Sequence, residues 1–132
     1  MPDPLFRKLD CLRLPVPDLD SGLAFYRDRL GHRLLWRTDT QASLQLPDSD
    51  AELVIQTEQP HAEANLLVAS ADAAAEAIVR AGGSILQPPF DIQVGRCAVL
   101  ADPWGNRLVV LDLGKGRLAT DAEGNVVGNE PP

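Results

Sequence analysis

The sequence predicts an α+β fold made of two successive modules with the same element order, strand, helix and three strands. Strand-like alternation from Leu9 to Val16 is followed by a helical pattern and three more strand-like segments, and this order returns from Asn65. Cys11 and Asn65, which take equivalent places in the two modules, lie 54 residues apart. We therefore expect a single domain, 1–132, with module one at about 7–58, module two at about 62–113 and a C-terminal tail at 114–132.

The elements of the first module follow from apolar periodicity and from the residues that end each segment. A strand over Leu9–Val16 is ended by Pro15 and Pro17, and Asp18 is an expected helix N-cap. The helix is expected to be seated on its sheet by Phe25 and Leu30 and to end at Gly31. The strands that follow are predicted at His32–Trp36, Ala42–Leu46 and Glu52–Thr57.

The second module repeats this order with a more alanine-rich helix. Asp72 is its expected N-cap, and the strand after the helix is expected to be broken by Pro88 and Pro89. The predicted elements are the strand Asn65–Ser70, the helix Ala73–Ala81, and the strands Ser84–Gln87, Gly95–Ala101 and Arg107–Asp112. The tail is expected to form a hairpin around Glu123-Gly124-Asn125.

Composition limits the partners of the chain. Twelve basic and 19 acidic side chains give a net charge of −7, which repels nucleic acid phosphates. No apolar run approaches the roughly 18 residues of a membrane span, and the first residues lack an apolar signal core. We expect a cytoplasmic protein that binds neither nucleic acid nor membrane, with Cys11 and Cys97 as free thiols.

Two sequence motifs resemble those of a known family. The stretch from Leu9 to Leu19, with Ala24-Phe25-Tyr26 and Leu30-Gly31 after it, resembles the opening of a vicinal oxygen chelate module. The turn Asp102-Pro103-Trp104-Gly105-Asn106, with Arg107-Leu108 after it, resembles the closing hairpin of the same module. This superfamily contains glyoxalases, extradiol dioxygenases, methylmalonyl-CoA epimerases, fosfomycin-resistance enzymes and bleomycin-resistance proteins. The resemblance covers about residues 7–113 and is specific for the fold, not for an activity.

The resemblance implies a sheet whose helix-free face lines a cup for a small organic ligand, and a homodimer. Strand alternation then assigns the side chains that face away from the helices. The residues expected to bind a ligand in this cup are Cys11, Arg13, Trp36, Glu52, Val54, Gln56, Asn65, Leu67, Arg107, Val109 and Leu111. In an alternative reading, Arg13, Glu52 and Arg107 form ion pairs that fill the cup. Trp104 is expected to contact a partner chain.

The resemblance also indicates which positions hold a metal in other family members. These positions correspond to Cys11, Val54, Asn65 and Val109, where the relatives usually place histidine or glutamate. Valine has no donor atom and an asparagine amide is a weak ligand, so we expect neither a metal nor another cofactor. The histidines His32 and His61 are expected outside the cup.

The function that these residues indicate is small-molecule binding of the glyoxalase and bleomycin-resistance type without the usual metal site. We expect no catalytic residue, because Cys11 has a cation, Arg13, on its face of the strand but no base. The alternative is a glyoxalase-like lyase, isomerase or dioxygenase that uses a divalent metal at other positions. A third reading is a module that binds another protein, with the cup collapsed.

Overall fold

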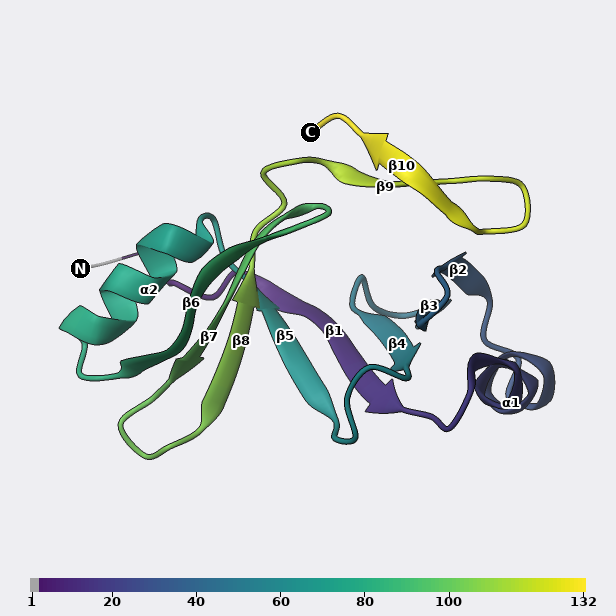
Figure 1. Cartoon of the computed structure of the whole chain (residues 1–132), viewed down its shortest axis with the longest axis horizontal. Coiled ribbons are helices and arrows are strands. Elements are labelled where there is room, and N and C mark those ends of the chain that lie inside the picture. Colours follow the sequence, from purple (N-terminus) through teal and green to yellow (C-terminus); the bar gives the residue numbers. More distant parts are fainter. Residues whose placement is uncertain (1–2) are drawn as a thin grey trace. The chain divides into compact units, whose positions relative to one another are not determined.

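The strands and helices follow the predicted order in both modules (Figure 1). The computed structural model describes residues 3–132. The first module contains β1 (Lys8–Pro15), α1 (Leu19–Leu23), the π-helical η1 (Ala24–Arg29), β2 (Leu34–Arg37), β3 (Gln41–Gln45) and β4 (Glu52–Gln56). The second contains β5 (Glu63–Leu67), α2 (Ala71–Arg80), β6 (Ser84–Ile92), β7 (Gly95–Ala101) and β8 (Arg107–Leu111). The α+β class and the repeated order of elements are confirmed.

The chain divides into two compact units, each of which contains most of one module and part of the tail. The first unit comprises Asp10–Ala64 and Ala119–Gly128. The second comprises the chain up to Leu9, together with Asn65–Leu118 and Asn129–Pro132. Each unit has its own hydrophobic core.

The sheet of the first unit is built around the parallel pair of β1 and β4. Its strand order is β2-β3-β4-β1, and β3 pairs antiparallel with both of its neighbours. Leu53 and Ile55 of β4 pack with Leu19 and Leu23 of α1 in one buried cluster. This face of the sheet is therefore the one that the helix covers, as the alternation along β4 predicts.

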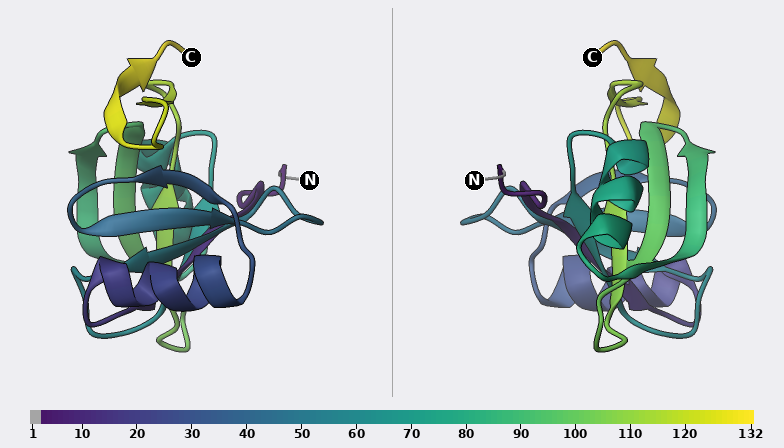
Figure 2. Two further views of the ribbon diagram at one scale, coloured as in Figure 1. Left: turned by 90° about the vertical axis from the view of Figure 1, so that its right-hand side faces the viewer. Right: turned by 90° about the vertical axis from the view of Figure 1, so that its left-hand side faces the viewer.

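The sheet of the second unit repeats this plan in the order β5-β8-β7-β6, with β5 and β8 parallel. Leu100 and Val110 are fully buried against Ala74 and Ile78 of α2. Figure 2 shows α2 lying along one face of these strands. Alanines at the buried positions of α2 let the helix backbone approach the sheet closely, which explains its alanine-rich sequence.

The first helix differs from the prediction in the way its second half is wound. After α1 the chain continues as η1, in which the Leu30 amide donates to the Phe25 carbonyl. A π-helical turn holds more residues than an α-helical turn and so rotates the residues that follow it. Phe25 and Leu30 are 45% and 53% exposed, and Tyr26 packs on the core in their place. The prediction that Phe25 and Leu30 seat the helix is wrong.

The predicted N-cap is confirmed for α1 and is wrong for α2. Asp18 accepts a hydrogen bond from the Ser21 amide, with 2.7 Å between Oδ1 and N. In the second module the cap is Ser70, whose extended backbone lets its hydroxyl accept from the Ala73 amide. Asp72 instead lies in the first turn of α2, where its carboxylate contacts Arg96. A serine two positions earlier satisfies the first free amides, so α2 begins sooner than predicted.

Strand β6 runs through both prolines that were expected to end it. It extends from Ser84 to Ile92, and its pairing with β7 is irregular between Gln87 and Phe90. A proline cannot donate to a neighbouring strand, but β6 is the last strand in the sheet order of its unit. Pro88 and Pro89 are therefore tolerated at an irregular edge position.

The predicted hairpin in the tail is confirmed as β9 (Arg117–Thr120) and β10 (Val126–Glu130). Its turn, Asp121 to Asn125, has the same hydrogen bonds as the turn from Asp102 to Asn106. In each turn the aspartate accepts from two backbone amides and from the asparagine side chain. In each, the glycine before the asparagine has a positive φ, 88° at Gly105 and 86° at Gly124. The same Asp-x-x-Gly-Asn sequence thus makes the same turn twice.

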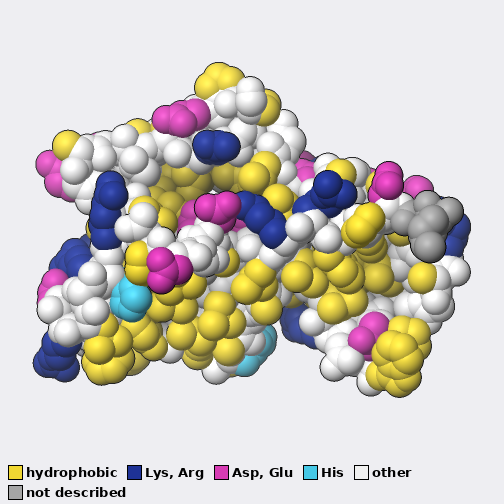
Figure 3. Space-filling view, turned by 180° about the vertical axis from the view of Figure 1, so that it is seen from behind, with side chains coloured by type: hydrophobic (Ala, Val, Ile, Leu, Met, Phe, Trp, Pro, Cys, Tyr) yellow, Lys and Arg dark blue, Asp and Glu magenta, His cyan; other side chains and the backbone are white. Residues whose placement is uncertain are grey.

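On the face shown in Figure 3, Lys and Arg side chains are interspersed with Asp and Glu side chains. Within residues 3–132, none of the helices has both the length and the apolar character needed to cross a membrane.

Candidate functional site

The candidate site in the first unit is the sheet face that α1 leaves uncovered. Arg13 of β1 and Ser43 of β3 both pair in register with Val54 of β4, so the three side chains lie side by side on one face. Ser43 and Val54 are buried, and Arg13 is half-buried. Neither Ser43 nor Val54 belongs to the apolar cluster on the helix side. The face therefore combines an apolar position with fixed polar groups.

Arg13 is neutralised by two acidic side chains, one from the segment that follows β4 and one from the first residue of β5. Its guanidinium lies 2.9 Å from the Glu58 carboxylate and 3.5 Å from that of Glu63. Gln41 also accepts from the guanidinium, at 3.5 Å. The alternative prediction that Arg13 forms an ion pair with Glu52 is therefore wrong. No periodicity could identify Glu58, because it lies in an irregular segment between β4 and β5.

Glu52 lies on the same sheet face but is held by neutral donors. Its Oε1 accepts from the Trp36 indole nitrogen at 2.9 Å and from the Ser43 hydroxyl at 2.6 Å. Among residues 3–132 Glu52 forms no ion pair. Trp36 and Glu52 are both half-buried, so part of each side chain reaches the surface. An oriented carboxylate beside an indole ring can accept from a ligand amine and can also contact an organic cation.

Gln56 lies on this face, but its side-chain amide is hydrogen-bonded to backbone groups of the protein. It is only 1% exposed, and its Oε1 accepts from the backbone amides of Glu58 and Gln59, each at 2.7 Å. Its Nε2 donates to the Gln59 carbonyl at 3.0 Å. Gln56 thus fixes the backbone of the segment in which Glu58 lies, and Glu58 forms the ion pair with Arg13.

Cys11 is buried beside Glu52, its register partner on β4. Burial raises the pKa of the Cys11 thiol well above its ordinary value. The negative charges of Asp10 and Glu52 raise this pKa further, and the charge of Arg13 opposes them. The thiol is therefore protonated at neutral pH and is a poor nucleophile.

We expect Cys11 to resist alkylation in the folded protein up to about pH 9, because the unfolded thiol has a pKa of about 8.5 and the folded one a higher value. Since the raised pKa favours the protonated folded state, its contribution to stability is present below pH 8.5 and declines as the pH rises further. Mass spectrometry of iodoacetamide-treated protein, with and without urea, measures this. Fast labelling of Cys11 without urea at pH 8 would contradict it.

The corresponding face of the second unit is mainly apolar. Val109 and Leu111 of β8 are buried with Cys97 and Val99 of β7, away from α2. The remaining predicted residues of this unit lie on β5 and β8: Asn65 pairs in register with Val109, Leu67 with Leu111, and Arg107 is exposed at the start of β8. The Asn65 Oδ1 is buried and has no hydrogen-bond partner among the described residues. That all these side chains contact a ligand stays a prediction.

The four positions that the resemblance assigns to metal ligands do not carry a suitable donor set. Val54 and Val109 are 2% and 4% exposed and end in methyl groups. Cys11 offers a single thiol, and Asn65 offers only an amide. Between Asp3 and Pro132, no group of three or more His, Cys, Asp or Glu side chains is arranged to hold a metal ion.

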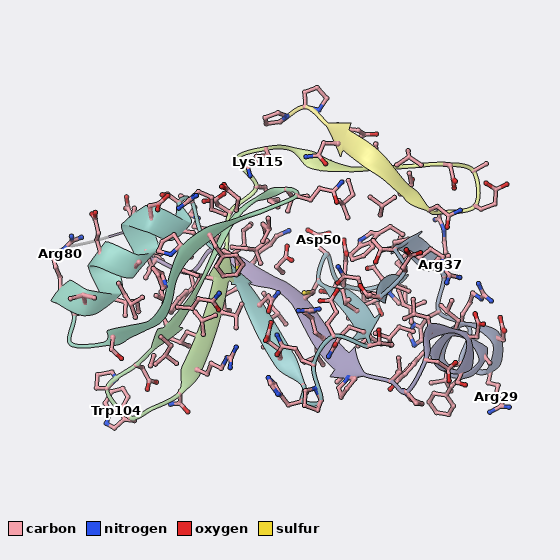
Figure 4. The ribbon with its side chains drawn as sticks, viewed as in Figure 1. Arg29, Arg37, Asp50, Arg80, Trp104 and Lys115 are labelled. Atoms are coloured by element: carbon pink, nitrogen blue, oxygen red, sulfur yellow. The ribbon has the colours of Figure 1, made fainter. Side chains whose placement is uncertain are left out.

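Trp104 and the two histidines lie in connecting segments. Trp104, which is labelled in Figure 4, lies in the turn between β7 and β8 and is 84% exposed. His61 is exposed after β4, and the Nδ1 of His32 lies 3.0 Å from the Gln45 carbonyl oxygen. That Trp104 contacts a partner chain stays a prediction.

Comparison with solved structures supports the same fold. Methylmalonyl-CoA epimerase from Mycobacterium tuberculosis matches with a TM-score of 0.70 and 18% identity over 85% of this chain and 91% of that one. Methylmalonyl-CoA epimerase from Streptomyces coelicolor matches with a TM-score of 0.66 and 18% identity over 81% and 97%. An extradiol ring-cleaving dioxygenase from B. fuscum matches with a TM-score of 0.59 and 21% identity over 85% of this chain but 34% of its own. At these identities the likeness shows the fold alone.

Comparison of sequences assigns the family. No curated protein sequence matches the chain significantly. The model of the Glyoxalase/Bleomycin resistance protein/Dioxygenase superfamily matches residues 8–110, which include every strand and helix of both modules apart from the last residue of β8. The chain therefore belongs to the Glyoxalase/Bleomycin resistance protein/Dioxygenase superfamily.

Proposed function

We propose that this protein binds a small organic molecule and does so without a metal ion. The observation that carries the proposal is the pair of buried valines, Val54 and Val109, at two of the positions where the family resemblance implies metal ligands. A hydrocarbon side chain cannot coordinate a cation, while it contributes apolar surface to a binding site. The proposal includes a cytoplasmic location and a homodimer.

The polar groups of the first unit supply the specificity of this site. Glu52 is held in one orientation by Trp36 and Ser43, so a ligand that contacts it finds an ordered carboxylate. Arg13 is already neutralised by Glu58 and Glu63. Ligand pockets typically combine a mainly apolar lining with a few placed polar groups. Glu52 is accordingly the charged group of this face that selects the ligand.

Metal analysis tests the first part of the proposal. Protein expressed in medium containing zinc, nickel, manganese and iron is expected to carry less than about a tenth of an equivalent of each metal. Its melting temperature is expected not to change with EDTA. A stoichiometric metal would overturn the proposal and would favour a metal-dependent lyase, isomerase or dioxygenase.

Ligand screening tests the second part. In a thermal-shift panel of aromatic antibiotics and metabolites, a ligand at a hundred times its Kd stabilises the protein by about 2.7 kcal/mol, which raises the Tm by several degrees. We expect Glu52→Gln to reduce this shift, because it removes the oriented charge while leaving a similar shape. Glu76→Gln, an equal charge change at an exposed position of α2, is the matched control. Equal shifts in Glu52→Gln and wild-type protein would remove Glu52 from the site.

A further inference from the structure

The chain forms an open hollow of about 420 Å³ beside the end of β2. This volume is within the range of small-molecule sites, about 300–1,000 Å³. Its lining comes from two segments that are distant in sequence but belong to the first unit: Arg37, Thr38 and Asp39 from the end of β2, and Asn125 and Val126 from the start of β10. The Arg37 side chain is labelled beside these segments in Figure 4.

Backbone contacts hold the two segments together. The Arg37 amide donates to the Gly124 carbonyl at 2.8 Å, and Arg37 and Asn125 form a parallel β-bridge. Gly124 permits this approach, because its φ is 86° and a Cβ there would lie 3.2 Å from Leu34. Thr38 is fixed in turn by hydrogen bonds between its hydroxyl and the amides of Thr40 and Gln41. The rim of the hollow is therefore ordered before any ligand arrives.

The charged side-chain groups of the hollow have no partner among residues 3–132. Across residues 3–132, neither the Arg37 guanidinium nor the Asp39 carboxylate forms a hydrogen bond or an ion pair. Arg37 is half-buried and lines the hollow, so its guanidinium is available to an anionic ligand there.

We propose that this hollow binds a small monocarboxylate that carries a hydroxyl or amino group next to its carboxylate. The planar guanidinium of Arg37 matches the two oxygens of a carboxylate. Asp39 accepts from the neighbouring hydroxyl or amine, and its negative charge disfavours dianions such as phosphate. Val126 supplies a small apolar contact for the rest of the ligand.

This site is independent of the proposed ligand site of the family fold. Trp36 and Arg37 are consecutive residues of β2, so their side chains project to opposite faces. Their partners on β3 show the same alternation: Trp36 pairs with Ser43 on the helix-free face, and Arg37 pairs with Ala42, which belongs to the cluster beneath α1. Binding at one site can therefore be lost while the other is kept.

Nuclear magnetic resonance titration of the full chain with lactate tests the proposal. We expect saturable shifts of the backbone amides of Thr38, Asp39, Asn125 and Val126. Propionate lacks the hydroxyl, 1,2-propanediol lacks the carboxylate, and inorganic phosphate carries more charge. Each is expected to bind at least about tenfold more weakly, because each loses or opposes a charge-assisted contact.

Two variants with the same charge change make the result specific. Arg37→Gln is expected to weaken lactate binding at least about tenfold, whereas Arg29→Gln, at an exposed position near the end of η1, leaves it unchanged. The unliganded spectra show whether each variant is folded. Absence of saturable shifts with lactate, equal binding by Arg37→Gln, or equal shifts with phosphate would each overturn the proposal.

Discussion

Replacing Asp112 by alanine is expected to lower the free energy of unfolding by about 3–5 kcal/mol. Asp112 follows β8 and is buried. Its carboxylate accepts from three backbone amides: Ala71 at 2.8 Å, Arg96 at 3.0 Å and Gly114 at 3.2 Å. The carboxylate thereby ties the start of α2 to the start of β7 and to the segment after β8. Alanine would leave these amides without their acceptor.

Urea unfolding followed by circular dichroism measures this loss. Asp112→Asn, which keeps one carbonyl oxygen of the same shape, is expected to lose less stability than Asp112→Ala. The Asp112 side chain packs closely on the backbone of Gly95, because a Cβ at Gly95 would lie 2.4 Å from the Asp112 Oδ1 and 2.2 Å from its carbonyl oxygen. A loss below about 1 kcal/mol for Asp112→Ala would show that water replaces the carboxylate.

Replacing Ile55 by alanine is expected to lower the free energy of unfolding by about 2–5 kcal/mol. Ile55 is fully buried between β4 and α1. Its Cδ1 lies so close to Gly22 that a Cβ on Gly22 would come within 2.8 Å of it. The helix backbone therefore packs directly on this side chain, and alanine would leave a cavity that the helix cannot fill without moving.

A graded series separates the cavity from other causes. Ile55→Val removes only the Cδ1 methyl group and is expected to cost about 0.5–1.5 kcal/mol, less than Ile55→Ala. Leu86→Ala, at a position of β6 that is 58% exposed, is the control and is expected to change stability by no more than about 0.5 kcal/mol. Similar losses for Ile55→Ala and Leu86→Ala would contradict the packing described for this core.

Local features of the fold followed from the sequence, because each depends on neighbouring residues. Asp18 caps the first helix, and alternation along β4 places Leu53 and Ile55 toward that helix. The turn sequence Glu123-Gly124-Asn125 gave the hairpin of the tail. One error arose because two nearby residues could cap the same helix, and Ser70 caps α2 before Asp72 can. Another arose because β6 lies at the edge of the sheet, where Pro88 and Pro89 are tolerated.

The candidate site was only partly predictable, because strand alternation assigns residues to a face but does not identify their contacts in irregular segments. Alternation identified the strand residues on the helix-free face of the first unit, among them Arg13, Glu52 and Val54. It could not identify Glu58, whose irregular segment has no period, or the direction in which Glu52 is held. The hollow beside Arg37 also depends on a segment about 90 residues further along the chain.

The sequence by itself determined the family, the repeated order of elements and the absence of donor atoms at Val54 and Val109, because these depend on residue type and short-range pattern. The tertiary structure decided which charges are paired, since an ion pair depends on side chains that only folding brings together. It pairs Arg13 with Glu58 and Glu63, and it places the Trp36 indole and the Ser43 hydroxyl as donors to Glu52. It leaves the Arg37 guanidinium without an ion pair or hydrogen bond among residues 3–132.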